Sequence, residues 1–179
     1  MSSVEYSNYK HRHNFAIWAA ARAAQRGFTN VINLKNALES SSIGEFVEKP
    51  SGESKFDKKH AKWCNRICDY LHNQGVNEAT YGRAAKLVNV YLKSMVVLLD
   101  LSSEAAKFIH PPIDRILLQN IARDPNVNKE YSRKLRNTNW TSLDESEYFD
   151  LISILKEING DQPFWKIEEY WDVTSETSS

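Results

Sequence analysis

The sequence predicts an all-α fold, and two observations support this prediction. Apolar residues recur at steps of three and four along most of the chain, which is the spacing of the buried face of a helix. The 179 residues include only 6 Gly and 5 Pro, which favours helices over a chain of many turns. No strand-rich region interrupts this pattern. We therefore expect one compact domain of about seven to eight helices, without a sheet.

The chain length, the distribution of apolar residues and the cysteine content predict the domain boundaries and the class of protein. We expect a flexible tail at residues 1–8, one helical domain at 9–172 and a disordered tail at 173–179. No apolar run approaches the roughly 20 residues of a membrane span, and the first residues lack the apolar core of a signal peptide. Two cysteines do not form a disulfide framework, so a cytoplasmic protein without a membrane partner is expected.

The first 54 residues predict two helices and a loop. A helix is expected at about 9–26, where small and apolar residues form one face and Gly27 provides a stop. A second helix is expected at about 30–39. Residues 40–54 are rich in Ser, Gly and Pro, and they predict the longest irregular segment of the chain.

The predicted helix at 54–73 carries His60, Cys64, Cys68 and His72 at four-residue steps. Histidine and cysteine are zinc ligands, so a metal site is one interpretation of the spacing. Twelve residues of helix extend about 18 Å, however, so the four side chains cannot reach one ion. Burial of the cysteines beside apolar residues is the favoured explanation, and no metal or other cofactor is expected.

Residues 80–121 predict a long amphipathic helix, a short connector, a turn at Pro111-Pro112 and a second helix. One stripe of the long helix is apolar and is expected to be buried: Ala84, Leu87, Val88, Tyr91, Leu92, Met95 and Leu99. A different face carries Gly82, Lys86, Asn89 and Lys93. Asp114 begins the second helix, where free backbone amides favour a carboxylate. Adjacent helices thus present one amine and one carboxylate.

The remainder of the chain predicts three more helices. The helix at 128–137 carries basic side chains, Lys129, Arg133, Lys134 and Arg136, which suit either phosphate contacts or a solvated face. Ser142 and Glu145 have the spacing of a capping box and predict a helix that runs to about residue 158. The aromatic residues of a last helix at 163–171 are expected to seal the core.

The net charge of zero hides an asymmetry between the two ends of the chain. Residues 1–140, the basic body, contain 21 Lys and Arg against 13 Asp and Glu, whereas residues 141–179 contain 2 against 10. A surface that binds a polyanion, with an acidic appendage, has this distribution. Neutralisation of the two parts across an internal interface explains it equally well. The cluster from Lys10 to His13 likewise suits either a phosphate contact or a solvated helix start.

Two motifs of the central segment resemble the active-site half of the helix-hairpin-helix DNA glycosylases, and most of all their 8-oxoguanine glycosylase branch. In that family a Gly-x-x-x-Lys run opens the second helix of the hairpin, and a Pro-Val-Asp-like turn supplies a catalytic aspartate to the next helix. The matching runs here are Gly82-Arg-Ala-Ala-Lys86 and His110-Pro-Pro-Ile-Asp114. LHNQGVNEATYG replaces the usual Leu-Pro-Gly-x-Gly hairpin, and compact archaeal-type members also have a non-standard hairpin.

The resemblance implies a DNA-repair glycosylase with strand-cleaving lyase activity on 8-oxoguanine in duplex DNA. Lys86 would be the nucleophile and Asp114 the catalytic aspartate, with no cofactor. The residues expected to contact substrate or DNA are Gly82, Arg83, Asn89, Lys93, His110, Arg133, Lys134 and Arg136, with Trp18, Phe108 and Trp140 as candidates for the base pocket. The alternatives are a non-enzymatic helical module that binds nucleic acid and a module that binds another protein.

Overall fold

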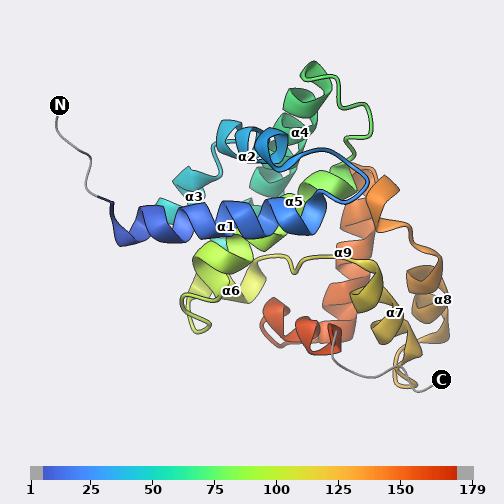
Figure 1. The fold of residues 1–179 in the computed structure, drawn as a ribbon. Coiled ribbons are helices and arrows are strands. Elements are labelled where there is room, and N and C mark those ends of the chain that lie inside the picture. Colours follow the sequence, from blue (N-terminus) through green and yellow to red (C-terminus); the bar gives the residue numbers. More distant parts are fainter. Residues whose placement is uncertain (1–5, 173–179) are drawn as a thin grey trace, which may run out of the picture.

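The computed structural model of the chain describes residues 6–172, which form helices and no strand (Figure 1). The predicted all-α single domain is confirmed. The α-helices are α1 (Asn8–Ala24), α2 (Val31–Ser40), α3 (Gly44–Glu48), α4 (Phe56–Asn73), α5 (Tyr81–Leu92), α6 (Glu104–Phe108), α7 (Arg115–Arg123), α8 (Lys129–Asn137) and α9 (Glu145–Asn159). Residues 1–5 of the tail predicted at 1–8, and the whole tail predicted at 173–179, lie outside the described residues. Helix α1 begins at Asn8, so the N-terminal tail was predicted one residue too long.

Helix α5 lies at the centre of the domain. Ten of its residues are buried, which is far more than the single apolar stripe of a surface helix. Helix α1 crosses α5 through a row of small residues, Ala16, Ala20, Ala21 and Ala24, and their size lets the two helices approach closely. Helix α4 packs against both α5 and α2. Residues on α5 are therefore held from several sides.

A second group of helices, α7, α8 and α9, forms the end of the molecule opposite the start of α1 (Figure 1). An extended segment through Pro111 and Pro112 connects α6 to α7, because neither proline can continue a helix. Asp114 is the N-cap of α7, as the sequence predicts. Helix α7 packs against α8 and against the 3₁₀ segment Phe164–Tyr170 near the end of the chain.

Several element boundaries differ from the predictions. The helix expected over residues 80–99 ends at Leu92 and continues as a π-helical turn over Lys93–Val97. The loop predicted at 40–54 contains α3, because Phe46 is buried there against Phe56 and Trp63. The predicted last helix is a 3₁₀ segment.

The capping box predicted at Ser142 and Glu145 is wrong by two residues. Asp144 caps α9 by accepting the Glu147 backbone N–H, and the Glu147 carboxylate accepts the Asp144 N–H. Ser142 ends a 3₁₀ turn, Trp140–Ser142, and its hydroxyl donates to the carbonyl of Asn139. Aspartate and serine cap equally well, so the sequence pattern fits both registers.

Between residues 6 and 172, no helix has the length and apolar character that crossing a membrane requires.

Candidate active site

Lys86 and Asp114, which are 28 residues apart in sequence, meet between α5 and α7. The Lys86 Nζ donates to the Asp114 Oδ2 at 2.8 Å. Lys86 is only 7% exposed, although its side chain carries a charge in this ion pair. A lysine is seldom so buried without a partner, so the pair is held in a largely water-free environment.

The Asp114 carboxylate is fixed by three donors. Its Oδ1 accepts the backbone N–H of Leu117 at 3.0 Å, which caps α7, and its Oδ2 also accepts the indole N–H of Trp171 at 2.9 Å. Burial raises the pKa of this carboxyl group, but the Lys86 ammonium and the N–H donors outweigh burial, so its pKa lies below the ordinary value. The pair is therefore a lysine beside an ionised carboxylate.

A second ion pair, between Lys93 and Glu168, lies beside the first one. Lys93 is about two turns beyond Lys86, at the start of the π-helical turn that follows α5, and Glu168 comes from the C-terminal 3₁₀ segment. The Lys93 Nζ also lies 5.6 Å from the centre of the Trp171 ring. Burial raises the pKa of Glu168, and its ion pair with Lys93 offsets only part of this effect.

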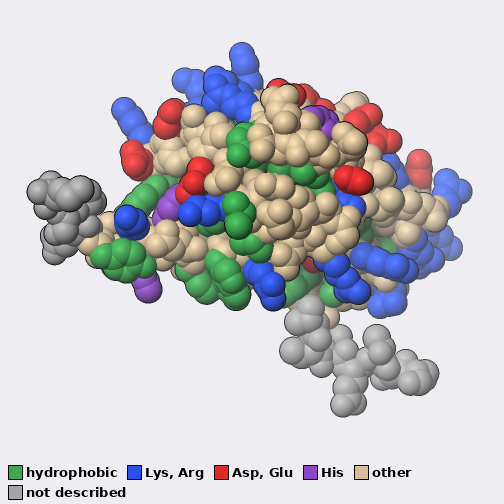
Figure 2. All heavy atoms as spheres, turned by 45° about the horizontal axis from the view of Figure 1, so that its top comes forward, with side chains coloured by type: hydrophobic (Ala, Val, Ile, Leu, Met, Phe, Trp, Pro, Cys, Tyr) green, Lys and Arg blue, Asp and Glu red, His purple; other side chains and the backbone are tan. Residues whose placement is uncertain are grey.

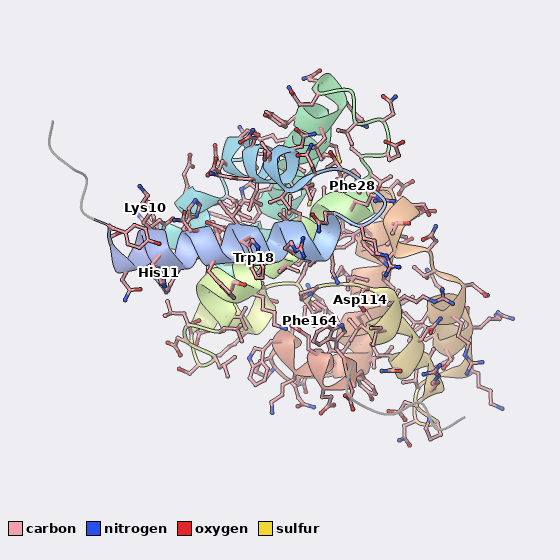
Figure 3. The ribbon with its side chains drawn as sticks, in the orientation of Figure 1. Lys10, His11, Trp18, Phe28, Asp114 and Phe164 are labelled. Carbon is pink, nitrogen blue, oxygen red and sulfur yellow. The ribbon has the colours of Figure 1, made fainter. Side chains whose placement is uncertain are left out.

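Both ion pairs border one pocket of about 200 Å³, between α1, α5 and the C-terminal segment. Its charged walls are Lys86, Asp114, Lys93 and Glu168, and its apolar walls include Ala23, Val90, Leu98, Pro112 and Trp171. Figure 3 places Asp114 at the head of α7, across the gap from the C-terminal half of α1. The pocket thus combines an amine, two carboxylates and an aromatic ring.

Gly82 and Trp140 position Lys86 from the other side. The Lys86 Nζ lies 5.6 Å from the centre of the Trp140 ring. A Cβ on Gly82 would be 2.0 Å from the Trp140 carbonyl oxygen, and the Gly82 N–H donates to the Leu143 carbonyl at 3.0 Å. The Gly82 position therefore admits no side chain. The segment over residues 140–143 covers it, so Gly82 is not available to contact DNA.

Asn89 and His110 were expected to contact substrate or DNA, but both are buried. The Asn89 side chain donates to the carbonyl of Pro111 at 3.0 Å and to the Tyr148 hydroxyl at 2.9 Å, and its oxygen lies 2.9 Å from His60 Nε2. His110 bonds to Tyr148 and to Asp57. These residues form a polar network inside the core, and through Pro111 the network fixes the segment that leads to Asp114.

The basic residues of α8 are on the surface, as the sequence suggests. Arg133 and Lys134 are exposed, while Arg136 is exposed and donates to the carbonyl of Ala122. In Figure 2 blue side chains gather at the right-hand end, where Figure 1 places α7 and α8. A hollow of about 290 Å³ beside α8 is bordered by Arg115, Arg136 and Trp140, and the ring of Trp140 also contacts Lys86. Trp140 thus lies between the basic surface and the lysine.

Three other candidates, Arg83, Phe108 and Trp18, do not line the Lys86 pocket. The Arg83 guanidinium lies over the Phe28 ring at 4.7 Å, on the loop after α1 (Figure 3). Phe108 is buried against Phe56 and does not reach the pocket. Trp18 is exposed on α1, outside the pocket.

Sequence reasoning missed Glu168 and Trp171. Their segment is predicted to seal the core, and Phe164 and Ile167 are indeed buried. Trp171, however, is 41% exposed and donates to Asp114. No local pattern in the sequence distinguishes an aromatic residue that packs in the core from one that lines a site.

Three of the four spaced residues of α4, His60, Cys64 and His72, have contacts with other protein groups; the His72 Nε2, for example, lies 3.0 Å from the Ala79 carbonyl. His60 is completely buried and bonds to Tyr81 and Asn89, and the Cys64 Sγ lies 3.6 Å from His60 Nδ1. Burial lowers the pKa of His60 to about 3. Within residues 6–172, no three His, Cys, Asp or Glu side chains come close enough together to hold a metal ion.

No protein-family model, curated protein or solved structure matches this chain.

Proposed function

We propose that the protein is a DNA base-excision glycosylase and lyase that acts on oxidised purine, with 8-oxoguanine in duplex DNA as the substrate. The observation that carries the proposal is the distance of 2.8 Å between Lys86 Nζ and Asp114 Oδ2 at the edge of one pocket. These two residues come from the two motifs that resemble the glycosylase family. A nucleophilic amine beside a carboxylate is what such a reaction needs.

In the proposed reaction the Lys86 ammonium first releases one proton to solvent, and the resulting neutral amine attacks C1′ of the deoxyribose. The bond from C1′ to the base breaks, and its electron pair leaves with the base, which takes up a proton. Opening of the sugar ring then gives a Schiff base between Lys86 and C1′. Loss of a C2′ proton from this intermediate expels the 3′ phosphate and cleaves the strand.

Asp114 is suited to two tasks in this sequence of steps. Because its pKa is below the ordinary value, the carboxylate is ionised at neutral pH and can stabilise the positive charge that develops on the sugar. It also lies at hydrogen-bond distance from the amine, so a proton can pass between the two groups without movement of either side chain.

The size of the pocket suits one unit of a larger substrate. Pockets for whole drug-sized ligands usually measure about 300–1,000 Å³, and this pocket measures about 200 Å³. A base inside a duplex cannot reach a buried lysine, so the target nucleotide must leave the stack. Arg133 and Lys134 on α8 offer charge for the phosphates of the flanking duplex.

The test is borohydride trapping on a duplex with one 8-oxoguanine, together with an assay for strand nicking. Wild-type protein is expected to give a reduced covalent adduct and a nicked strand, and Lys86→Gln neither. The control is Lys107→Gln, because Lys107 is on the surface of α6 and pairs only with Glu104 among the described contacts. The Lys107→Gln variant should form the same amount of covalent adduct as the wild type, and an undamaged duplex should give no adduct with either protein.

A second candidate is a non-enzymatic nucleic-acid-binding module in which Lys86 and Asp114 form a structural ion pair. The observation in its favour is that Trp171 also bonds to Asp114 and shields the pair. Duplex binding that weakens steeply with salt, without trapping or nicking, would support this candidate and contradict the enzyme. Absence of binding even at low salt would contradict both.

A further inference from the structure

A second hollow, of about 570 Å³, runs along α1 beside the Lys86 pocket. We call it the aromatic groove, and its main walls are Tyr6, Arg12, Phe15, Trp18 and Leu98. Most of its surface is apolar, yet it is open to solvent. Phe15, Trp18 and Leu98 are 60%, 54% and 62% exposed, which is unusual for side chains of this size on a soluble domain.

The groove continues into the Lys86 pocket. Ser94 and Leu98 border both hollows, so one wall is common to the two. Trp18 is labelled on α1 in Figure 3, and its side chain lines the groove. In Figure 2 green side chains gather along the lower left of the molecule, below α1. A ligand that enters the pocket can therefore extend along the groove.

The groove also offers positive charge. Arg12 lines it, and the Nε and Nη1 atoms of Arg12 are buried with no hydrogen-bond partner. Arg12 as a whole is half-buried and belongs to no ion pair among the described residues, so its positive charge is available to an anionic group of a ligand in the groove. Lys10 and His11 lie on the same turns of α1, as Figure 3 shows. No acidic side chain is among the described residues that line the groove.

We propose that the aromatic groove binds unpaired nucleotides that neighbour the reacting one, on the same strand. Bases would stack on Trp18 and Phe15, whose ring centroids are 5.9 Å apart, and a phosphate would meet Arg12. Aromatic platforms combined with cations are typical of proteins that bind single-stranded nucleic acid. An aliphatic protein partner would use Leu98 but would leave the Arg12 nitrogens unpaired.

This inference rests on the proposed function for the identity of the reacting nucleotide and deepens it. It implies that the preferred substrate carries its lesion next to a single-stranded segment, such as a gap, a flap or a strand end. A fully paired duplex would have to open several base pairs to fill the groove, and opening each pair costs free energy.

The test is the affinity of the full chain for a labelled thymidine oligonucleotide of about twelve nucleotides, measured by fluorescence anisotropy at low salt. Trp18→Ala is expected to weaken binding about 5- to 150-fold, the usual effect of losing one stacked base, and Trp18→Phe should restore most of it. An oligonucleotide of the same length with abasic sugars should bind the wild type as weakly as the thymidine oligonucleotide binds Trp18→Ala.

Two matched controls come from α2, away from the groove. Ile32→Ala removes a side chain that is 69% exposed, and Lys35→Gln removes one surface charge. Both should bind the oligonucleotide as the wild type does, whereas Arg12→Gln should weaken binding of both the thymidine and the abasic oligonucleotide. A uridine oligonucleotide, run in parallel, distinguishes RNA from DNA as the preferred strand, and tight Trp18-dependent binding of either one supports the groove.

Three results would overturn the inference. Trp18→Ala could bind the thymidine oligonucleotide as tightly as the wild type, or the abasic oligonucleotide could bind as tightly as the thymidine one. Alternatively, the wild type could fail to bind the oligonucleotide, and sedimentation velocity could show that it self-associates through Trp18. The groove would then be a contact between two copies of the chain.

Failure of the groove and failure of the proposed function are distinguishable. Trp18-dependent binding without trapping on any lesion would retain the groove and remove the enzyme. If borohydride trapping did not depend on Trp18, with or without an adjacent single-stranded segment, the enzyme would be retained and the groove would lose its proposed role.

Discussion

Asp114 performs three tasks at once, and this explains why its carboxylate is so firmly held. It caps α7, it pairs with Lys86 and it accepts the indole N–H of Trp171. The first two tasks could be predicted from the sequence, because the Pro-Pro turn places Asp114 at a helix start and the helical periodicity sets Lys86 apart from the buried stripe. The third depends on a residue 57 positions away, which only the folded chain brings near.

Trp171→Phe tests whether the indole stabilises the Asp114 carboxylate. Loss of the N–H donor should raise the pKa of Asp114 towards its ordinary value, because that donor favours the charged form. Carbon-13 NMR titration of the Asp114 carboxyl group measures this directly. The matched control is Trp165→Phe, since the buried indole nitrogen of Trp165 has no hydrogen-bond partner. Equal Asp114 pKa values in the two variants would contradict the assigned role of Trp171.

At the scale of elements, the start of α5 and the segment over residues 140–143 depend on each other. The Gly82 N–H donates to Leu143, the Thr80 hydroxyl donates to the Thr141 carbonyl, and the Trp140 carbonyl occupies the space that a side chain on Gly82 would need. This contact holds Trp140 over Lys86. The sequence marks Gly82 through the resemblance, but the need for a glycine at this position arises from packing.

Gly82→Ala should therefore destabilise the fold, although alanine is the better helix former. A Cβ at 2.0 Å from a backbone oxygen forces the two segments apart, and overpacking of this kind costs about 1–3 kcal/mol or more. Urea unfolding monitored by tryptophan fluorescence measures the decrease in the free energy of unfolding. Gly52→Ala is the control, because nothing lies within 4 Å of its added Cβ. Unchanged stability of Gly82→Ala would mean that the close contact does not exist in solution.

The helices themselves were largely predictable, and their ends were less so. Apolar periodicity located α1, α2 and α4, and the start of α5, to within a few residues. The π-helical turn after Leu92 and the 3₁₀ segment at Phe164–Tyr170 carry no distinctive composition, so both were predicted as ordinary helix. Helix α3 was missed because one buried phenylalanine, Phe46, stabilises a turn among residues typical of loops.

At the scale of the whole molecule, the core contains two histidines, and their burial in the folded protein favours the neutral imidazole. His60 and His110 are 0% and 1% exposed, and burial lowers the pKa of each. The value for His60 is about 3. This network could not be predicted from the sequence, because its members come from α4, α5, α9 and the segment before α7. Such a network ties the helices together through polar contacts as well as apolar ones.

Stability should therefore fall on mild acidification. Below the ordinary pKa of about 6.5, the unfolded chain binds protons that the folded His60 and His110 exclude, so the free energy of unfolding decreases as the pH falls. At about pH 5 the loss from His60 alone is on the order of 2 kcal/mol relative to pH 7. Urea midpoints at the two pH values measure it. Equal midpoints would show that these histidines titrate normally in the folded state.

Internal ion pairs neutralise only part of the charge difference between residues 1–140 and residues 141–179. Among the ion pairs of residues 6–172, Lys93–Glu168 is the one that joins a basic residue of the body to an acidic residue of the C-terminal part. The exposed cations of α8 have no such partner among these pairs. Neutralisation across an interface therefore accounts for a small part of the asymmetry, and the surface of α8 keeps its positive charge.

The identity of the lysine that forms the Schiff base tests the central claim most directly. The reduced adduct on an 8-oxoguanine duplex, digested with trypsin, can be located by mass spectrometry. Because trypsin does not cut after a modified lysine, an adduct on Lys86 appears in the peptide 84–93, and an adduct on the neighbouring Lys93 appears in 87–107. We predict the first peptide alone. An adduct on Lys93, on other lysines, or no adduct at all would contradict the assignment of Lys86 as the nucleophile.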